Sequence, residues 1–380
     1  MSIEERAKLI SRLTEEVMTR DDLYLLLSKN EKLQHYIGFE ISGKIHLGTG
    51  LACLQKVKDL HEAGVTCNIF LADWHTWIND KLGGQREIIK NVAVGYFQEG
   101  MQVVYACLGG NPKDLNFKLG SDLYDKNNKY WETFVEIAKN TSLNRIKRSI
   151  TILGRKEGDV VDFAKLLYPV MQVADIFVQQ IHLPHTGLDQ RKAQVIAREV
   201  AKKLKVSPLI LKGEIVKPVA IHHHLILGLQ KPTIWPIPEG IDKQELWGSM
   251  KMSKSKPDGC IFIHDSTSEI KRKIEQAFCP EREIEFNPII DWVEFLILNR
   301  EKKITIKREL KYGSDLEIES ILDLKEKFQK GELHPEDLKN FVADYLINFL
   351  KPVRDHFSTG RPKKMLDELE KLIQNYSSRP

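Results

Sequence analysis

The spacing of apolar residues changes twice within the first third of the chain. Residues 36–40 alternate bulky apolar with small or polar residues, which is typical of a short buried strand. Ser42 and Gly43 interrupt this pattern, and apolar residues then recur at helical spacing from His46 onward. A further apolar run at 65–73 predicts a second buried strand. This strand, helix, strand order predicts a parallel sheet.

The loop before that helix carries candidate chemistry for a phosphate. Unpaired N–H groups and the positive dipole end make a helix N-terminus attractive to anions. His46 can donate to a phosphate oxygen, and Gly48 lets an adenine or a ribose lie close to the backbone. A histidine and a glycine at a helix start are also common for packing reasons. Asp73 and His75 follow the second strand, and both interpretations remain open for them: loop caps, or side chains in the same crevice as His46.

Further periodic segments predict an α/β fold with additional helices and strands. The predicted long helix ends in a basic cluster, Arg145, Lys147 and Arg148, although a charged helix face is usually only solvated. Three adjacent histidines follow the last predicted strand, and they cannot all reach one metal ion from regular structure. The predicted elements are short helices within 1–34, a helical crossover at 83–108, a strand at 116–121, one long helix from 131 to about 153, and a strand at 216–221 leading into His222, His223 and His224.

The most informative later segment is 162–181, which is apolar on every side and therefore predicts a buried helix. Tyr168, Gln172 and Asp175 interrupt it at i, i+4 and i+7, so they share one helical face. Pro169 predicts a kink next to Tyr168. Buried polar groups need partners, so this face meets either a polar ligand or an internal hydrogen-bond network.

Two short segments suggest nucleotide chemistry. Asp189 precedes an amphipathic helix and suits either a helix cap or the two hydroxyls of a ribose. Lys251 and Lys254 lie three residues apart, with a Pro-Asp-Gly turn after them. They predict a mobile basic loop that can hold a polyphosphate, and a solvated surface loop is the alternative.

Composition narrows the class of protein. The 380 residues predict two domains and perhaps a small third piece, and 42% hydrophobic with 29% charged residues is typical of a soluble globular protein. Residues 1–20 do not resemble a signal peptide, and no membrane-spanning apolar run occurs. Five scattered cysteines favour neither a disulfide framework nor a zinc site, so a cytoplasmic location is expected. A net charge of +4 permits an RNA partner without requiring one.

Together these motifs resemble a known family. The sequences HLGT and KMSKS, in this order, are similar to the paired motifs of class I aminoacyl-tRNA synthetases. The segments between them resemble tyrosyl-tRNA synthetases of the archaeal and eukaryotic type. The resemblance rests on YIGFEISGKIHLG at 36–48, LADWH at 71–75, YPVMQVAD at 168–175, GLDQRK at 187–192, KMSKS at 251–255 and ELHPEDLKN at 332–340.

The resemblance implies a role for each matching residue. Tyr36 and Asp175 would bind the phenol hydroxyl of tyrosine, while Tyr168, Gln172 and Gln190 would hold its ammonium group. Thr49 stands where the family usually has histidine, which leaves its contact with ATP in question. The residues implied for ATP are His46, Gly48, Thr49, Gly187 and Asp189, with Lys251 and Lys254 on the β and γ phosphates; His46 and the two lysines would be catalytic.

The resemblance also implies the reaction and the partners. The tyrosine carboxylate would attack the α-phosphate of ATP, assisted by Mg²⁺, and the tyrosyl group would pass to tRNA(Tyr). No tightly bound metal or organic cofactor is expected. The implied RNA contacts are Arg148 on the acceptor stem and Tyr312, His334 and Asp337 around the anticodon. The sequence at 334–337 is also typical of an ordinary helix start.

The implied architecture is a Rossmann-like parallel sheet with helices on both faces, followed by a mostly α-helical anticodon-binding domain. The expected divisions are a helical lead-in at 1–34, a catalytic domain at 35–240 whose insertion at 120–165 forms a homodimer interface, a lysine-loop linker at 241–262 and the helical domain at 263–380. Two alternatives remain: a tryptophan-activating enzyme of the same fold, which has no need of the Tyr36 and Asp175 pair, and a catalytically silent paralogue that binds RNA, suggested by Thr49.

Overall fold

The protein is built around one six-stranded sheet, seen in a computed structural model that describes residues 1–155, 158–308 and 313–377. Neighbouring strands are parallel except β1 and β8, which are antiparallel. In the order β1-β8-β5-β2-β3-β4 the strands are Thr14–Met18, Ala220–His223, Leu183–Gly187, Gln34–Phe39, Thr66–Leu71 and Asn116–Leu119.

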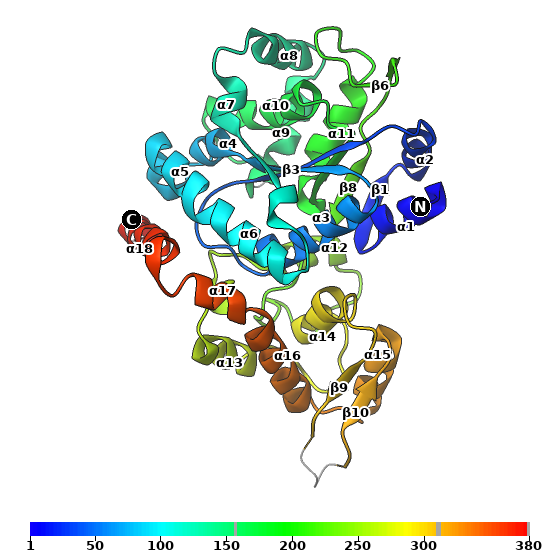
Figure 1. Cartoon of the computed structure of the whole chain (residues 1–380), viewed down its shortest axis with the longest axis vertical. Coiled ribbons are helices and arrows are strands. Elements are labelled where there is room, and N and C mark those ends of the chain that lie inside the picture. The colour runs from blue at the N-terminus through cyan, green and yellow to red at the C-terminus, as the bar shows by residue number, and fades with distance from the viewer. Residues whose placement is uncertain (156–157, 309–312, 378–380) are drawn as a thin grey trace.

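The chain extends the sheet in two directions from β2. It first adds β3 and β4 on one side, and later returns to add β5 and β8 on the other side. Since crossovers between parallel strands are right-handed, this reversal places the connecting helices on opposite faces. Helices α3 (Cys53–Glu62) and α6 (Gln98–Cys107) pack together on one face, and α10 (Phe163–Val178) and α11 (Arg191–Val200) pack together on the other (Figure 1). The predicted α/β architecture with helices on both faces is confirmed.

The reversal between β2 and β5 also fixes where a ligand can bind. At such a switch point the loops leaving the two strands turn to opposite faces and leave a crevice at their carboxyl ends. The loop after β2 contains His46, and the turn after β5 contains Asp189. Two segments far apart in the sequence therefore meet at one edge of the sheet.

The predicted helical lead-in is wrong in one respect. Between α1 (Ile3–Ser11) and α2 (Arg20–Ser28), the segment Thr14–Met18 forms the edge strand β1 of the central sheet. Its two acidic residues contact histidines: Glu16 lies 2.9 Å from His222 of β8, and Glu15 contacts His224, the residue after β8. This strand depends on a partner more than 200 residues away, so no local pattern could predict it.

Two other predicted elements have different bounds. The long helix expected at 131–153 is broken into α8 (Asn128–Lys139), α9 (Leu143–Ser149) and the turn η5 (Ile150–Leu153), because Ser142 caps a new helix. The strand expected at 216–221 begins only at Ala220 and continues into the histidines. Those histidines contact three different partners: Glu16 for His222, His185 for His223, and Asp291 for His224.

The C-terminal part is mostly helical and carries one small hairpin. Its last helix, α18, lies beside the N-terminal half, away from β9 and β10 (Figure 1). The helices are α12 (Lys243–Met250), α13 (Thr267–Glu275), α14 (Pro288–Trp292), α15 (Ile321–Lys330), α16 (Pro335–Phe349), α17 (Lys351–His356) and α18 (Gly360–Ser377), and the hairpin strands are β9 (Ile304–Ile306) and β10 (Leu316–Ile318).

The remaining elements are short. Among the described residues, no helix combines the length and the apolar character needed to cross a bilayer. The short elements are η1 (Gly48–Ala52), α4 (Asp73–Ile78), η2 (Lys81–Gly84), α5 (Arg86–Val92), η3 (Ala93–Phe97), η4 (Pro112–Asp114), α7 (Gly120–Tyr124), η6 (Leu188–Gln190), β6 (Ile210–Leu211), β7 (Glu214–Ile215), η7 (Pro257–Gly259) and η8 (Val293–Ile297).

Candidate active site

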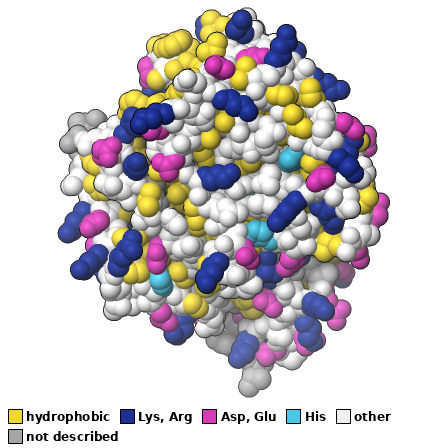
Figure 2. Space-filling model, turned by 45° about the horizontal axis from the view of Figure 1, so that its top comes forward, with side chains coloured by type: hydrophobic (Ala, Val, Ile, Leu, Met, Phe, Trp, Pro, Cys, Tyr) yellow, Lys and Arg dark blue, Asp and Glu magenta, His cyan; other side chains and the backbone are white. Residues whose placement is uncertain are grey.

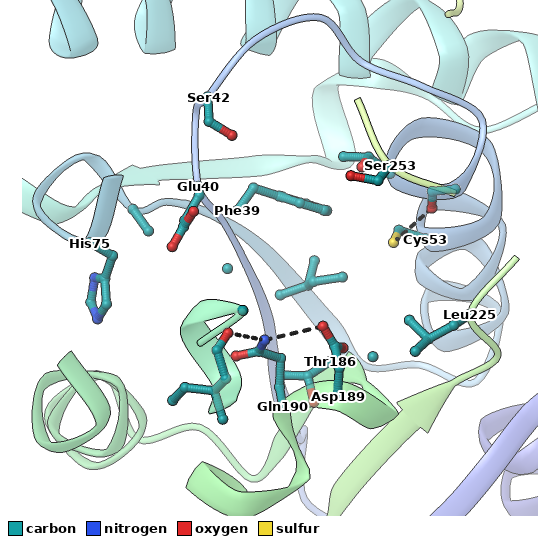
Figure 3. A pocket seen from close by; sticks show the side chains of 18 of the residues that line it. Phe39, Glu40, Ser42, Cys53, His75, Thr186, Asp189, Gln190, Leu225 and Ser253 are labelled. Atoms are coloured by element: carbon teal, nitrogen blue, oxygen red, sulfur yellow. Dashed lines mark hydrogen bonds between the residues drawn. The ribbon is translucent and has the colours of Figure 1, made fainter. Parts of the chain in front are cut away.

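A cavity of about 630 Å³ lies at the carboxyl ends of β2 and β5. Figure 3 shows side chains from the loop after β2, from α4, from the turn after β5 and from the lysine loop surrounding it. The structure brings together here all the residues that the sequence suggested for an amino acid and for ATP: Tyr36, His46, Gly48, Thr49, Tyr168, Gln172, Asp175, Gly187, Asp189, Gln190, Lys251 and Lys254.

Asp175 is the most buried carboxyl group of the cavity, with 1% of its surface exposed. Its Oδ1 accepts hydrogen bonds from the hydroxyls of Tyr124, at 3.0 Å, and Tyr130, at 3.1 Å. Burial raises the pKa of Asp175 well above its usual range, although the two hydroxyls oppose this. Its second oxygen lies 3.7 Å from Nε2 of His75. The side chain is thus held in place through one oxygen, while Oδ2 can serve a ligand.

Tyr36, in the middle of β2, lies next to this carboxyl group. It is almost fully buried, and both burial and the charge of Asp175 raise the pKa of its hydroxyl well above the usual range. A neutral phenol can donate one hydrogen bond and accept another. Tyr36 and Asp175 together can therefore bind a group that both accepts and donates, such as a hydroxyl.

The other two polar residues of α10 differ in their pairing. The hydroxyl of Tyr168 donates to Oε1 of Glu40 at 2.8 Å. In the described part of the chain, the buried Oε1 of Gln172 has no hydrogen-bond partner. An orphaned buried acceptor beside a cavity indicates a ligand that donates, because leaving such an atom unpaired is costly.

The sequence could not decide whether Asp73 and His75 line the cavity, and the structure shows that only His75 does. Asp73 accepts from the backbone N–H of Ser121 at 2.9 Å and does not line the cavity. His75 lines it, is 2% exposed, and has no hydrogen-bond partner at either ring nitrogen within the described residues. Burial lowers the pKa of His75 to about 3, so the ring is neutral.

The loop after β2 couples His46 to Thr49. Nδ1 of His46 accepts from the backbone N–H of Thr49 at 3.3 Å, which leaves the ring proton on Nε2. That nitrogen lies 3.1 Å from the Thr49 hydroxyl oxygen, so the hydroxyl proton is available to a ligand. Burial lowers the pKa of His46 to about 3. A Cβ at Gly48 would come within 3.1 Å of the His46 ring, so a side chain there would push the ring by a few tenths of an ångström.

Across the cavity, Asp189 is held by Lys251. Nζ of Lys251 lies 2.6 Å from Oδ2 of Asp189. Burial opposes ionisation, but Lys251 outweighs it and lowers the pKa of Asp189. The amide of Gln190 donates to the carbonyl oxygen of Ile152 at 2.8 Å and to Asp189 at 3.3 Å (Figure 3). A Cβ at Gly187 would come within 2.5 Å of the Asp189 carboxylate, so any side chain there would displace Asp189.

Backbone hydrogen bonds anchor the lysine loop at both ends. At its start, the N–H of Met252 donates to the carbonyl oxygen of Ile226 at 2.7 Å. At its end, the carbonyl oxygen of Ile261 accepts from the N–H of Leu47 at 3.0 Å, next to His46. Lys254 lies between these anchors, and burial lowers its pKa to about 8. The anchors bring two cationic side chains to the mouth of the cavity.

Comparison with known proteins agrees with this arrangement. Class I tRNA synthetases of the tryptophan and tyrosine group match residues 28–351. The tyrosine–tRNA ligase of Thermococcus kodakarensis is 53% identical over 97% of this chain and 99% of its own length. The crystal structure of tyrosyl-tRNA synthetase from Pyrococcus horikoshii, complexed with L-tyrosine, has a TM-score of 0.94 at 50% identity and covers 98% of this chain and 100% of that one.

The chain belongs to the tyrosyl-tRNA synthetases. The enzyme of Pyrococcus furiosus is similarly close, with 52% identity over 98% of this chain and 99% of its own length. This membership confirms the family inferred from the HLGT and KMSKS motifs.

The residues that the family resemblance links to RNA lie far from one another in the chain. Arg148 is exposed near the end of α9, where its side chain bonds the carbonyl oxygen of Asn144 at 3.4 Å. His334 caps α16 by accepting from the N–H of Glu336 at 3.2 Å, and Asp337 follows in the first turn. Tyr312 lies outside the described residues.

Sequence reasoning missed four side chains that complete the synthetase site. Tyr124 and Tyr130 hold Asp175, Glu40 holds Tyr168, and Cys53 contacts the Gly48 carbonyl oxygen at 3.2 Å (Figure 3). Glu40 was within reach of sequence analysis, because an acidic residue at the carboxyl end of a parallel strand lies at the ligand edge. The two tyrosines belong to a segment assigned to an interface and carried no spacing signal.

Proposed function

We propose that the protein is a tyrosine–tRNA ligase that first forms tyrosyl-adenylate and then charges tRNA(Tyr). The single observation that carries this proposal is the shared cavity: Tyr36 and Asp175 line the same space as the His46 loop and the two loop lysines. A hydroxyl-binding pair at one end and a phosphate-binding loop at the other match tyrosine and ATP side by side.

The tyrosine end is assigned by hydrogen-bond complementarity. The substrate phenol donates to Oδ2 of Asp175 and accepts from the hydroxyl of Tyr36. Its ammonium group donates to the orphaned Oε1 of Gln172, to the amide oxygen of Gln190 and to the hydroxyl oxygen of Tyr168. Phenylalanine would leave Asp175 and Tyr36 buried without a partner, which disfavours its binding.

The ATP end is assigned by charge and by close approach. The ribose hydroxyls bind Asp189 next to Gly187, and the adenine lies against Gly48. The ribose replaces Lys251 at Asp189, which frees Lys251 for the β and γ phosphates together with Lys254. The Nε2–H group of His46 donates to the hydroxyl oxygen of Thr49, and the hydroxyl of Thr49 donates its own proton to a phosphate oxygen.

With both substrates bound, catalysis is positioning and charge stabilisation. The tyrosine carboxylate attacks the α-phosphate in line, and pyrophosphate leaves with its charge held by the lysines. Among the described residues, no three His, Cys, Asp or Glu side chains are grouped as metal ligands, so we assign Mg²⁺ to the phosphates of ATP. Bound there, Mg²⁺ neutralises phosphate charge.

We assign the RNA contacts to the two ends of the molecule. Arg148 contacts the acceptor stem, and Tyr312, His334 and Asp337 surround the anticodon. His334 is well exposed beside the start of α16, which supports this role without abolishing its capping role. The protein acts in the cytoplasm, where its tRNA is found.

We also propose a homodimer through 120–165. Trp131 and Val135 of α8 and Leu143 of α9 are large apolar residues with at least 36% of their surface exposed. Figure 2 shows hydrophobic side chains gathered at the upper end of the molecule, where Figure 1 places α8. An exposed apolar patch on a folded chain is typical of a subunit interface.

Pyrophosphate exchange into ATP, measured with each amino acid in turn, tests the proposal. We expect exchange that depends on tyrosine. Faster exchange with tryptophan than with tyrosine would contradict the tyrosine assignment. Binding of tRNA(Tyr) without any exchange would instead identify the RNA-binding paralogue that Thr49 suggested.

A further inference from the structure

Helices α17 and α18 leave the C-terminal part and pack on the catalytic half (Figure 1). His356 of α17 bonds Glu99 of α6 at 2.8 Å. On α18, Leu369 is fully buried, and the ring of Tyr376 covers Gly83 so closely that a Cβ there would lie 2.0 Å from it. The last helix is therefore docked on η2 and η3, which lie between β3 and β4 in the chain.

One end of α18 reaches the cavity itself. Ile373 is among the residues that line it, although it comes 120 residues after the lysine loop. Its Cδ1 lies 3.6 Å from the position of a Cβ on Gly43, and Cδ of Lys254 lies 3.4 Å from the same position. Gly43 has φ of +144°, a conformation that favours glycine. The stem of Lys254 and the tip of Ile373 thus both border Gly43.

A charge pair holds the next residue of the same loop. Nζ of Lys44 lies 3.2 Å from Oε1 of Glu370, one helical turn before Ile373, and 4.6 Å from the centre of the Phe262 ring. The following N–H, of Ile45, donates to the hydroxyl of Tyr96 at 3.0 Å. Residues 42–45 contain no regular structure of their own, so neighbouring elements set their conformation.

We infer that α18 is a positioning element of the ATP phosphate site. Ile373 and Glu370 hold the loop at 42–45, and that loop supports the stem of Lys254. The last helix of the C-terminal part therefore forms one wall of the catalytic cavity and fixes the second loop lysine. This inference rests on the proposed function, in which Lys254 binds the phosphates of ATP.

The inferred role predicts a selective defect. The proposed tyrosine-binding residues lie on β2, α10 and η6, whereas α18 packs mainly on η2 and η3. Loss of the Ile373 side chain should therefore weaken the use of ATP and leave the use of tyrosine unchanged. Small displacements of positioned groups reduce rates strongly, so we expect KM for ATP to rise by about tenfold.

The test is pyrophosphate exchange by the full chain carrying Ile373→Ala, with KM measured separately for ATP and for tyrosine. We expect a higher KM for ATP alone, recovery in Ile373→Leu, and a smaller rise in Glu370→Gln. Glu368→Ala, an exposed position on the same helix, is the matched control and should behave as wild type. An unchanged KM for ATP, or an equal rise of both KM values with a lower Tm, would overturn the inference.

A double-mutant comparison tests whether α18 acts through Lys254. In a Lys254→Ala background, Ile373→Ala should have no further effect on KM for ATP, and a full additional effect would overturn the inference. If wild-type protein shows no tyrosine-dependent exchange, the proposed function fails. If wild type exchanges and Ile373→Ala matches it, only the role of α18 fails.

Discussion

The two ends of the cavity are built in different ways. At the tyrosine end, most of the side chains come from β2 and α10, and two of them already have protein partners: Asp175 with Tyr124 and Tyr130, and Tyr168 with Glu40. At the ATP end, the side chains come from loops, and Asp189 is paired with Lys251, a residue that has its own role in phosphate binding. The tyrosine end is therefore preorganised, whereas the ATP end must exchange one internal ion pair for its ligand.

This difference assigns separate tasks to the two ends. Rigid elements hold a site more accurately than loops, so discrimination among amino acids belongs to the helix and the strand. Loops can change their contacts during a reaction, and pyrophosphate must leave, so the phosphate contacts belong to the loops. Variants of the two ends should consequently affect different kinetic constants.

The largest expected effect is that of Lys254→Ala. Removing a positioned donor to a charged transition state lowers kcat by about 100-fold, and the KM for tyrosine should stay within about twofold of wild type. Pyrophosphate exchange at saturating tyrosine measures this. Lys256→Ala, an exposed lysine two residues later, is the control. Equal losses in the two variants would mean that the loop contributes only general positive charge.

At the opposite end, Asp175→Ala should relax selectivity. Without the carboxylate the preference for tyrosine over phenylalanine should fall by about 10- to 100-fold, because the unpaired buried group that disfavours phenylalanine is gone. The ratio of kcat/KM for the two amino acids in the exchange reaction is the measurement. Tyr124→Phe, which leaves the carboxylate in place, should retain most of the preference. An unchanged ratio in Asp175→Ala would remove Asp175 from the discriminating pair.

Alkaline pH should affect the ATP end. Burial lowers the pKa of Lys254 to about 8, so its charge is present below this pH and is lost as the pH rises through it. The kcat/KM for ATP, which reports ionisations of the free enzyme, should fall above pH 8 by at most about tenfold per pH unit. Lys254→Arg keeps its charge and should lose this decline even at a lower absolute rate. The same decline in Lys254→Arg would assign it to another group.

The smallest expected effect is that of Lys251→Met on adenosine binding. Adenosine has a ribose but no phosphates, so it must displace Lys251 from Asp189 without any compensating contact. A partly exposed ion pair contributes about 0–1 kcal/mol, so the variant should bind adenosine up to about fivefold more tightly by calorimetry. Weaker binding by Lys251→Met, with Lys256→Met unchanged, would show that Lys251 does not compete for the ribose site.

Side-chain periodicity within single segments was enough to predict much of this site. The spacing of Tyr168, Gln172 and Asp175 placed them on one face of a buried helix, and they line the cavity together. A strand, a loop and a helix start placed His46 at the ligand edge. The same reasoning failed at β1, where two acidic residues are paired with His222 and His224, in β8 and directly after it. It also failed at Ser142, where a cap divides the predicted long helix.

By itself, the sequence determined several of the strands and helices, because helical and strand periods act over a few neighbouring residues, and its motifs determined the family and the candidate substrate-binding residues of the cavity. The tertiary structure alone decided the hydroxyls on Asp175, the pairing of Lys251 with Asp189 and the docking of α18 beside Gly43. Each of these contacts joins residues between about 50 and 330 positions apart. Such contacts form only when the complete chain is packed, so a local sequence pattern cannot predict them.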